Sequence, residues 1–376
     1  MIIKRYLRNA YLKMRCLLLG ILFHLKKTQH LQPDQIESIV AIRTDRAGDL
    51  VVSLPAIRAL KELFPKARLS VVARPQNLVL LNNNPLIDEL IAFQGFWNLL
   101  KYLRRRKFSL AVDLLMDYPL KNALLVFFSN ASLKAGFAIA GRGRLFNIAF
   151  TPSNQKKQMS EHLLDLIRQI ANVAGMPAVS VIGSLPELFV SSEKKTRALE
   201  FLKNNGINEK ETIVGLHPGG NYPSQNWGKD KFAQLANRIQ SKYQAKIIII
   251  GSNQESKLLA QIASLMKGKP IIAQGLSLDA LAALIQRLSL LVCNNSGPLH
   301  IAAALGVPTV STMGPTDPHL WWPQGQENKV IRRELPCSPC NLSFCLRHDC
   351  MNLITVEEME KAVDILMPRV TRKNNE

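Results

Sequence analysis

Short apolar runs alternate with longer amphipathic segments along most of the chain after Glu37. Runs of β-branched and other apolar residues predict strands, and apolar positions at three- and four-residue spacing between these runs predict helices. In the first half the predicted strands are residues 38–44, 67–74, 88–93 and 109–115, and the predicted helices are residues 50–64, 96–108 and 118–130. This order is typical of βαβ units in a parallel sheet.

The polar stretch Thr151–Ser160 interrupts the alternation, which restarts after two further helices at Thr212. The second half predicts strands at residues 212–217, 246–250, 270–274, 290–294 and 308–313, and helices at residues 229–243, 255–266, 278–288 and 298–306. We therefore expect an α/β protein with two Rossmann-like, doubly wound parallel-sheet domains facing a cleft. The first domain should cover residues 36–160 and the second residues 161–376.

The first 35 residues have a different pattern, with many cations among leucine and isoleucine residues. Apolar side chains recur at helical spacing at Leu7, Ala10, Met14, Leu18, Ile21 and Leu25. The longest uncharged run, Cys16–Leu25, is too short to span a bilayer, and no small-residue cleavage site follows it. We therefore expect residues 1–35 to form an amphipathic basic helix at a membrane surface. The alternative is a helix packed on the protein's own core.

Composition narrows the possible partners. The 376 residues are 47% hydrophobic, as in a globular protein, and 48 Lys and Arg against 28 Asp and Glu give a net charge of +20. Such a charge favours anionic partners, namely nucleic acid, anionic lipid or a phosphorylated substrate. Aromatic residues make up only 6% of the chain, and the sequence has no strand of interleaved basic and aromatic residues. This argues against nucleic acid.

Candidate chemistry lies in the loops that follow the predicted strands, where ligands bind in such sheets. The loop Asn294–His300 leads from a buried strand into a helix with Pro298 near its start, and a second loop, Gly314–Pro318, follows the next strand. Free N–H groups at a helix start favour phosphate, so we expect an anion site here. Neither half contains a G-x-G-x-x-G dinucleotide fingerprint or a P-loop.

Four motifs occur in order along the chain: "AIRTDRAGDLVVSLPAIRAL", "GLHPGG" followed by "NW", "NNSGPLHIAAALGVPTV" and "GPTDP". Together they resemble the ADP-heptose:lipopolysaccharide heptosyltransferase family, glycosyltransferase family 9, over about residues 39–367. The resemblance implies the two-Rossmann architecture known as GT-B. It also implies metal-independent transfer of a heptose, with inversion at the anomeric carbon, from ADP-heptose to a lipopolysaccharide core.

The resemblance also implies roles for particular residues. By itself Asp49, which follows Gly48 at a predicted helix start, is a candidate N-cap; the resemblance makes it the base that deprotonates the acceptor hydroxyl. The implied donor-binding residues are Gly219, Gly220, Asn295, Ser296, Gly297, His300, Thr316 and Asp317. Arg142 and Arg144, in a Gly-rich basic loop, are candidates for contacting phosphate or carboxylate groups of the acceptor, or else are solvated cations.

Two positions depart from the family pattern. Many relatives have Asp directly before the Ser/Thr-Gly pair, where this chain has Asn295, and many have Lys two residues before the loop tryptophan, where it has Gln225. Nearby Lys229 or Lys231 could offset the lost ammonium. Alternatively, the chain is a same-fold glycosyltransferase for O-antigen or capsule that uses another nucleotide sugar.

Four cysteines, Cys337, Cys340, Cys345 and Cys350, have the close spacing of a metal site. The alternatives are a disulfide or free thiols packed as small apolar side chains. We expect no cofactor in catalysis, and a structural metal is possible only on this cluster. A basic, metal-clustered nucleic-acid-binding protein is the non-enzymatic alternative. The main expectation is a peripheral enzyme on the cytoplasmic face of the inner membrane that binds a nucleotide-diphospho-sugar and an anionic, lipid-linked glycan, with no nucleic acid as partner.

Overall fold

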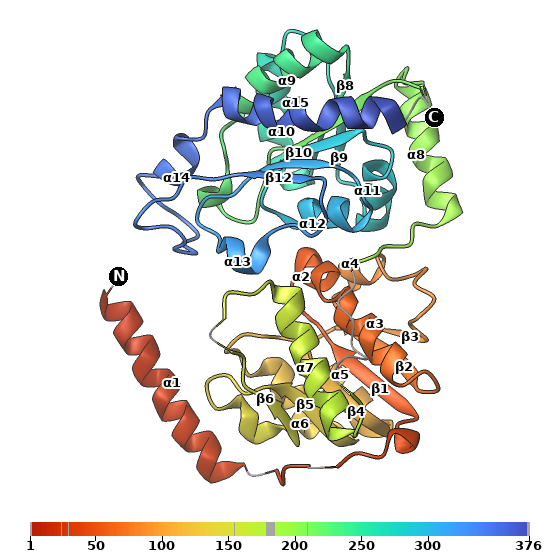
Figure 1. Cartoon of the computed structure of the whole chain (residues 1–376), viewed down its shortest axis with the longest axis vertical. Helices are drawn as coiled ribbons and strands as arrows, with labels where there is room; N and C mark the ends of the chain where they lie inside the picture. Colours follow the sequence, from red (N-terminus) through yellow and green to blue (C-terminus); the bar gives the residue numbers. More distant parts are fainter. Residues whose placement is uncertain are drawn as a thin grey trace. The chain divides into compact units, whose positions relative to one another are not determined.

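The computed structural model describes residues 2–23, 25–28, 30–153, 155–177, 185–208 and 210–373. The chain divides into two compact units, Met1–Ser184 and Leu185–Glu376. Each unit contains one six-stranded sheet whose strand pairs are all parallel. Figure 1 shows the two sheets and the helices that flank them.

The sheet of unit 1 has the strand order β3-β2-β1-β4-β5-β6. The strands are β1 (Ser38–Ile42), β2 (Arg68–Ala73), β3 (Glu89–Ala92), β4 (Phe108–Asp113), β5 (Ala131–Phe137) and β6 (Ile148–Phe150). The helices are α1 (Ile2–Leu22), α2 (Ala47–Val52), α3 (Leu54–Leu63), α4 (Pro75–Leu78), α5 (Phe96–Arg105), α6 (Lys121–Phe128) and α7 (Met159–Val173), with 3-10 turns η1 (Pro33–Gln35) and η2 (Arg142–Leu145).

Alternating side chains of the central strands explain why helices cover both faces of this sheet. Val40 and Ile42 of β1 point into a core formed with α5 and α6, while the intervening Ile39 and Ala41 are also fully buried. Helices α3 and α7 contact each other and lie in front of the sheet in Figure 1.

The sheet of unit 2 has the equivalent order β12-β11-β10-β7-β8-β9. The strands are β7 (Ile213–His217), β8 (Lys246–Gly251), β9 (Ile271–Gln274), β10 (Leu290–Asn294), β11 (Thr309–Thr312) and β12 (Asn328–Ile331). The helices are α8 (Ser192–Asn204), α9 (Lys229–Tyr243), α10 (Ser256–Leu265), α11 (Leu278–Ile285), α12 (Gly297–Ala304), α13 (Pro318–Trp321), α14 (Asp349–Asn352) and α15 (Val356–Lys373), with 3-10 turns η4 (Pro223–Gln225) and η5 (Asn253–Glu255). Helices α9, α10 and α15 share one core with the sheet, and α11 packs against α12 and α8.

The elements differ from the predicted ones in several respects. The helix expected over residues 50–64 is two helices, α2 and α3, which meet at Ser53 just before Pro55. Strands β5, β6 and β12 and helices α4, α13, α14 and α15 were not predicted. The division between the units lies after Ser184, whereas the sequence placed it after residue 160, because α7 packs on α3 and the end of the first sheet.

Helix α1 attaches to unit 1 through one narrow face. Arg15 Nη1 donates to the Tyr118 carbonyl over 2.6 Å, and its Nε and Nη2 donate to the Ala140 carbonyl over 3.1 and 2.7 Å. Gly141, at φ 86°, allows the close approach, since a Cβ there would lie 2.9 Å from the Cα of Cys16. The other side of α1 exposes apolar side chains, namely Tyr11, Met14, Leu17, Leu18, Ile21 and Leu22. In the described part of the chain, no helix has the length and apolar character needed to cross a membrane.

Candidate functional site

The sheet of unit 1 brings several polar loops to the carboxyl end of β1. Ile42 is paired with Val72 of β2 on one side and with Asp113 of β4 on the other. The residues that follow these strands therefore meet at one edge, where β1 leads into α2. This is the strand-order switch point at which ligands bind in open α/β sheets.

Asp49 lies in the first turn of α2 and is not its N-cap. The N-cap is Arg46, which makes no capping hydrogen bond through its side chain. The Asp49 carboxylate instead faces Arg43, with Oδ1 at 3.6 Å from Nη2, and 18% of its side chain remains exposed. The carboxylate is therefore not used up in capping, and it lies at the positive end of the helix.

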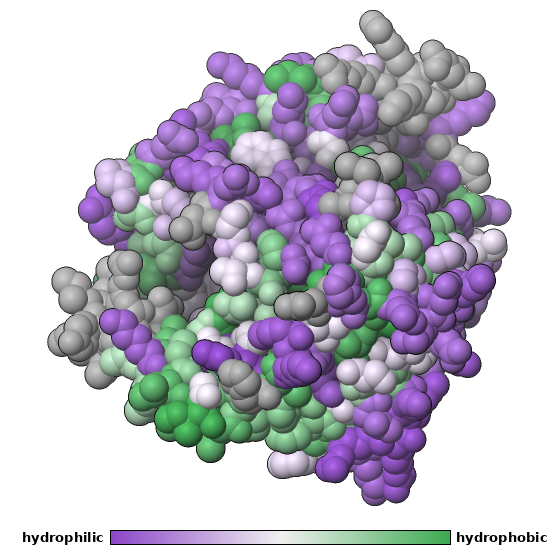
Figure 2. All heavy atoms as spheres, turned by 60° about the horizontal axis from the view of Figure 1, so that its bottom comes forward, coloured by the Kyte–Doolittle hydropathy of each residue, from purple (hydrophilic) through white to green (hydrophobic). Residues whose placement is uncertain are grey.

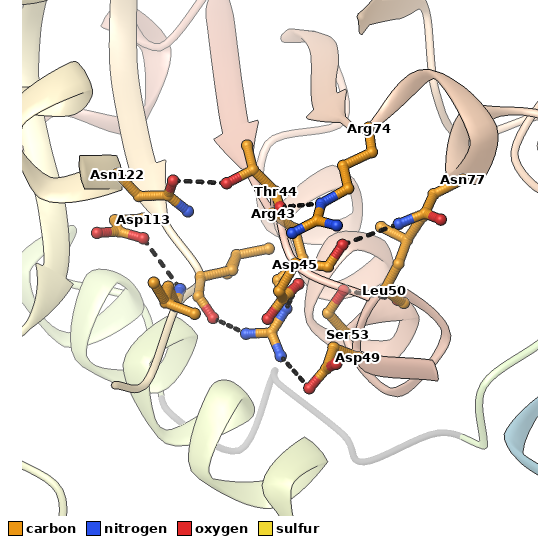
Figure 3. Close-up of polar contacts among 12 residues, drawn as sticks. Arg43, Thr44, Asp45, Asp49, Leu50, Ser53, Arg74, Asn77, Asp113 and Asn122 are labelled. Atoms are coloured by element: carbon orange, nitrogen blue, oxygen red, sulfur yellow. Dashed lines mark hydrogen bonds and ion pairs between the residues drawn. The ribbon is translucent and has the colours of Figure 1, made fainter. Parts of the chain in front are cut away.

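Arg43, which the sequence prediction missed, organises this edge of the sheet (Figure 3). It is buried, with only 1% of its surface exposed, and its Nη1 donates to the Leu114 carbonyl at the end of β4. Its Nε lies 3.0 Å from Oδ1 of Asp45, and its Nη2 faces Asp49. One guanidinium thus contacts the carboxyl groups of both Asp45 and Asp49.

The loop that carries Asp45 is fixed by neighbouring strands (Figure 3). Thr44 Oγ1 donates to Asn122 Oδ1 over 2.7 Å, and Arg74 Nε donates to the Thr44 carbonyl over 2.8 Å. Asn77 Nδ2 donates to the Asp45 carbonyl over 3.0 Å. These contacts join the loop to α6 and to the segment after β2, so the backbone that places both carboxylates is held from two sides.

The Asp45 carboxyl group is a perturbed acid at this edge. Burial raises the pKa of Asp45 to about 6, and the charges of Asp49 and Asp113 act in the same direction, while Arg43 opposes them. Burial also raises the pKa of Asp113, against the opposing charge of Arg142. Perturbed acids of this kind cluster at functional sites.

Arg142 does not have the predicted role of an acceptor contact in this structure. Its side chain is fully buried and forms an ion pair with Asp113, which is also fully buried. Its Nη1 donates to the carbonyls of Leu115, over 2.8 Å, and Asp117. The Arg142 guanidinium thus joins η2 to β4, because the buried Asp113 carboxylate requires a positively charged partner. Arg144, two residues later, is exposed.

In unit 2, Asn294 at the end of β10 positions the loop after β7. Its Nδ2 donates to the carbonyls of Pro218 and Gly219, over 2.7 and 3.1 Å. Its Oδ1 accepts from the Trp227 backbone N–H over 3.2 Å and from the Thr312 hydroxyl over 2.9 Å. The predicted residues Gly219 and Gly220 are therefore held against the end of β10.

The predicted anion loop leads directly into α12. Ser296 is the N-cap, and its hydroxyl makes no capping bond but lies 3.3 Å from Nδ1 of His217. Gly297 begins the helix, and His300 lies one turn further on, with its ring 6.2 Å from that of Trp321. Ser296 and Gly297 thus lie at the end of α12 toward which the first helical N–H groups are directed, and His300 follows one turn later.

Three amide atoms in this region are buried without a hydrogen-bond partner among the described residues: Asn295 Nδ2, Gln225 Oε1 and Asn226 Oδ1. Gln225 donates to the hydroxyl of the predicted residue Thr316 over 3.2 Å. Asp317, by contrast, is the N-cap of α13 and accepts from the His319 N–H over 2.9 Å. Orphaned amide groups suit a polar ligand with many hydroxyl groups.

Glu255 and His217 are further polar residues of unit 2 that sequence reasoning missed. The Glu255 carboxylate fills the space beside Gly219, where a Cβ would lie 1.6 Å from Oε1. Its Oε2 accepts from the Ser252 N–H over 2.7 Å. Burial lowers the pKa of His217, and the charge of Glu255 opposes this effect. The Gly-Gly pair was the available signal, because it indicates close approach of another group.

All four cysteines of the C-terminal loop are free thiols. Burial, together with the charges of the other three cysteines, raises the pKa of Cys350 to about 11. Within residues 337–350, as elsewhere in the described part of the chain, no three His, Cys, Asp or Glu side chains are arranged to hold a metal ion. The described arrangement is that of free thiols, one of the alternatives that the sequence left open.

Comparison with known proteins links this arrangement to one family. The profile of glycosyltransferase family 9 (heptosyltransferase) matches residues 96–349. Lipopolysaccharide heptosyltransferase 3 from Escherichia coli is 25% identical over 355 residues, which cover 86% of this chain and 97% of that protein.

Two solved structures share the fold. The glycosyl transferase family 9 protein from Veillonella parvula has a TM-score of 0.79 at 20% identity, covering 91% of this chain and 100% of that one. The E. coli ADP-heptose lps heptosyltransferase II has a TM-score of 0.74 at 22% identity, covering 88% and 99%. The expected GT-B fold class is confirmed.

Proposed function

The chain belongs to glycosyltransferase family 9, the heptosyltransferases, and we propose that it transfers a heptose from ADP-heptose to the core of lipopolysaccharide. The observation that carries this proposal is the partly exposed carboxylate of Asp49, held beside Arg43 at the strand-order switch point of unit 1. The names of the relatives supply the sugar and the acceptor, since both the E. coli lipopolysaccharide heptosyltransferase 3 and the heptosyltransferase II are lipopolysaccharide enzymes by name. Family membership favours a transferase over a basic nucleic-acid-binding protein.

The proposed reaction inverts the anomeric carbon. The acceptor hydroxyl oxygen forms the new bond to that carbon, Asp49 takes the hydroxyl proton, and the bond to the diphosphate breaks with its electron pair leaving on ADP. Negative charge grows on the leaving diphosphate. The N–H groups at the start of α12, with Ser296 and His300, are the groups proposed to stabilise it. In this proposal these protein groups act without a metal ion.

The donor's sugar hydroxyls are proposed to meet the amides of unit 2. Asn295 Nδ2 offers a donor, while Gln225 Oε1 and Asn226 Oδ1 offer acceptors, and all three are unpaired among the described residues. Gln225 and Asn295 are also the neutral positions at which this chain departs from the family pattern. They favour one alternative, a same-fold enzyme that takes another nucleotide sugar.

The proposed place of action is the cytoplasmic surface of the inner membrane, where a lipid-linked acidic acceptor is found. Six apolar side chains of α1 are exposed between Tyr11 and Leu22. Figure 2 shows hydrophobic side chains gathered at the lower left of the face that it brings forward. An apolar helix face on a chain of net charge +20 is the combination that binds anionic lipid. Exposed Arg144 is the remaining predicted contact for an acidic acceptor.

A panel of nucleotide sugars tests the proposal. Purified protein with deacylated lipopolysaccharide acceptor should turn over ADP-heptose, and Asp49→Asn should reduce kcat at least about a hundredfold while circular dichroism shows a normal fold. Asp230→Asn is the matched control, because it makes the same chemical change at an exposed position of α9 that belongs to neither proposed binding site. Turnover with a different donor alone would support the alternative enzyme and contradict the heptose assignment.

A further inference from the structure

Asp45 lies beside the proposed base with one carboxyl oxygen that lacks a hydrogen bond. Arg43 Nε and Asp45 Oδ1 are 3.0 Å apart, yet neither atom makes a hydrogen bond to any described residue. Their contact is therefore an ion pair without hydrogen-bond geometry. A hydrogen bond with good geometry would hold the Arg43 guanidinium on Asp45. Because the observed ion pair lacks that geometry, the positive charge of Arg43 can also be shared with Asp49.

Asp45 and Asp49 share the charge of Arg43. The charged groups that act on Asp45 are Arg43 at the end of β1, Asp49 on α2 and Asp113 at the end of β4. Asp113 is ion-paired with the buried Arg142 and is influenced less by Arg43 than by Arg142, so Asp45 and Asp49 are the two carboxylates in ion-pair contact with Arg43. Two carboxylates around one cation in a poorly solvated place carry excess negative charge, and the charge of Asp49 makes Asp45 harder to ionise.

We propose that Asp45 is a positioning residue that sets the strength of Asp49 as a base through its share of Arg43. This inference rests on the proposed transferase function. When Asp45 is ionised, Arg43 is divided between two carboxylates, and Asp49 accepts the acceptor's hydroxyl proton more readily. When Asp45 is protonated, Arg43 pairs with Asp49 alone, and Asp49 becomes a weaker base.

The change in charge of Asp45 falls in a useful pH range. Burial raises the pKa of Asp45 to about 6 despite the opposing charge of Arg43. Asp45 is therefore ionised at neutral pH, which is the state that strengthens the base. Below about pH 6 it gains a proton, and the rate should fall as it does so.

A carbon-13 titration of aspartate carboxyl groups in the full-length protein tests the coupling directly. In the wild type one carboxyl carbon should titrate near pH 6, and this signal should be absent in Asp45→Asn. In Asp49→Asn the same signal should move about one pH unit lower, because a repelling charge is gone. An unmoved midpoint would overturn the inference, and it would do so whether or not the protein transfers heptose.

Kinetics give the second readout. Asp45→Asn should lower kcat about three- to tenfold at neutral pH with little change in donor KM, and the acidic limb of the pH–kcat profile should move to lower pH. Asp45→Glu, which keeps the charge, should retain that limb. A fall in kcat with an unmoved limb would mean that Asp45 has only a structural role. If instead Asp49→Asn retains full turnover, the base assignment fails while the carboxyl titration still decides the coupling.

Discussion

Replacing Asp45 by Asn should make unit 1 more stable at neutral pH, because the native carboxyl group is ionised there at a cost. Burial raises the pKa of Asp45 from 3.8 to about 6, so the folded protein holds this proton to a higher pH than the unfolded chain does. The resulting stabilisation is fully present below the unfolded value and is lost as pH rises through about 6. Asn resembles the protonated acid and does not titrate.

The magnitude follows from the difference of about two pKa units. At roughly 1.4 kcal/mol per unit, the ionised carboxyl group costs about 3 kcal/mol above pH 7. About 1.4 kcal/mol of this cost develops between pH 5 and pH 8, when both titration curves are taken into account. The side chain is 24% exposed, so solvent screens only a minor part of this cost.

Pulse proteolysis in urea measures this effect when peptides from unit 1 are followed by mass spectrometry. The gap in unfolding free energy between Asp45→Asn and the wild type should widen by about 1.4 kcal/mol from pH 5 to pH 8. Asp230→Asn makes the same chemical change at an exposed position of α9 and serves as the control. If the Asp45→Asn gap is equal at both pH values, the description of Asp45 as a destabilised carboxylate is wrong.

Three further changes test other parts of the structure. Arg142→Ala should cost about 3–5 kcal/mol in thermal or urea unfolding, since it leaves Asp113 buried without its cation; a loss below about 1 kcal/mol would contradict the buried pair. Gly219→Ala should displace the Glu255 carboxylate and weaken ADP binding severalfold in calorimetry with a stability change under about 1 kcal/mol; unchanged affinity would argue against a nucleotide at this loop. Ile21→Ser, at an exposed position of α1, should weaken binding to anionic vesicles without loss of stability, because burying such a side chain in the membrane is worth about 2 kcal/mol. Leu19→Ser, at a buried position, should instead destabilise the packing of α1 on unit 1. Equal vesicle binding by Ile21→Ser and the wild type would refute the membrane role.

The central strands could be predicted from the sequence because burial on both faces makes each a continuous apolar run, as in residues 290–293. Strand β5 contains Lys134 and Gly136 among its seven residues, so its pattern is too polar to indicate a strand. The break between α2 and α3 depends on a single proline, Pro55.

Only some residues of the candidate site could be predicted, because the others depend on contacts between distant parts of the chain. The loop before α12 follows from a local motif, whereas the role of Asp49 as a base follows only from the family resemblance. The role of Arg142 depends on Asp113, 29 positions earlier in the chain, and only the pairing of β1 with β4 brings Arg43 to the Leu114 carbonyl. Neither contact leaves a local pattern, and the same holds for the perturbed Asp45. Charge and a Gly-rich setting alone therefore made Arg142 look like a surface cation.

Mass spectrometry of lipopolysaccharide from a strain that lacks this protein tests the proposed function most directly. The core of that strain should be lighter by one heptose, together with any sugars that are attached through it. A plasmid encoding the wild-type chain should restore the mass, and one encoding Asp49→Asn should not. A core of unchanged mass, with or without the plasmid, would contradict transfer of heptose to lipopolysaccharide by this enzyme.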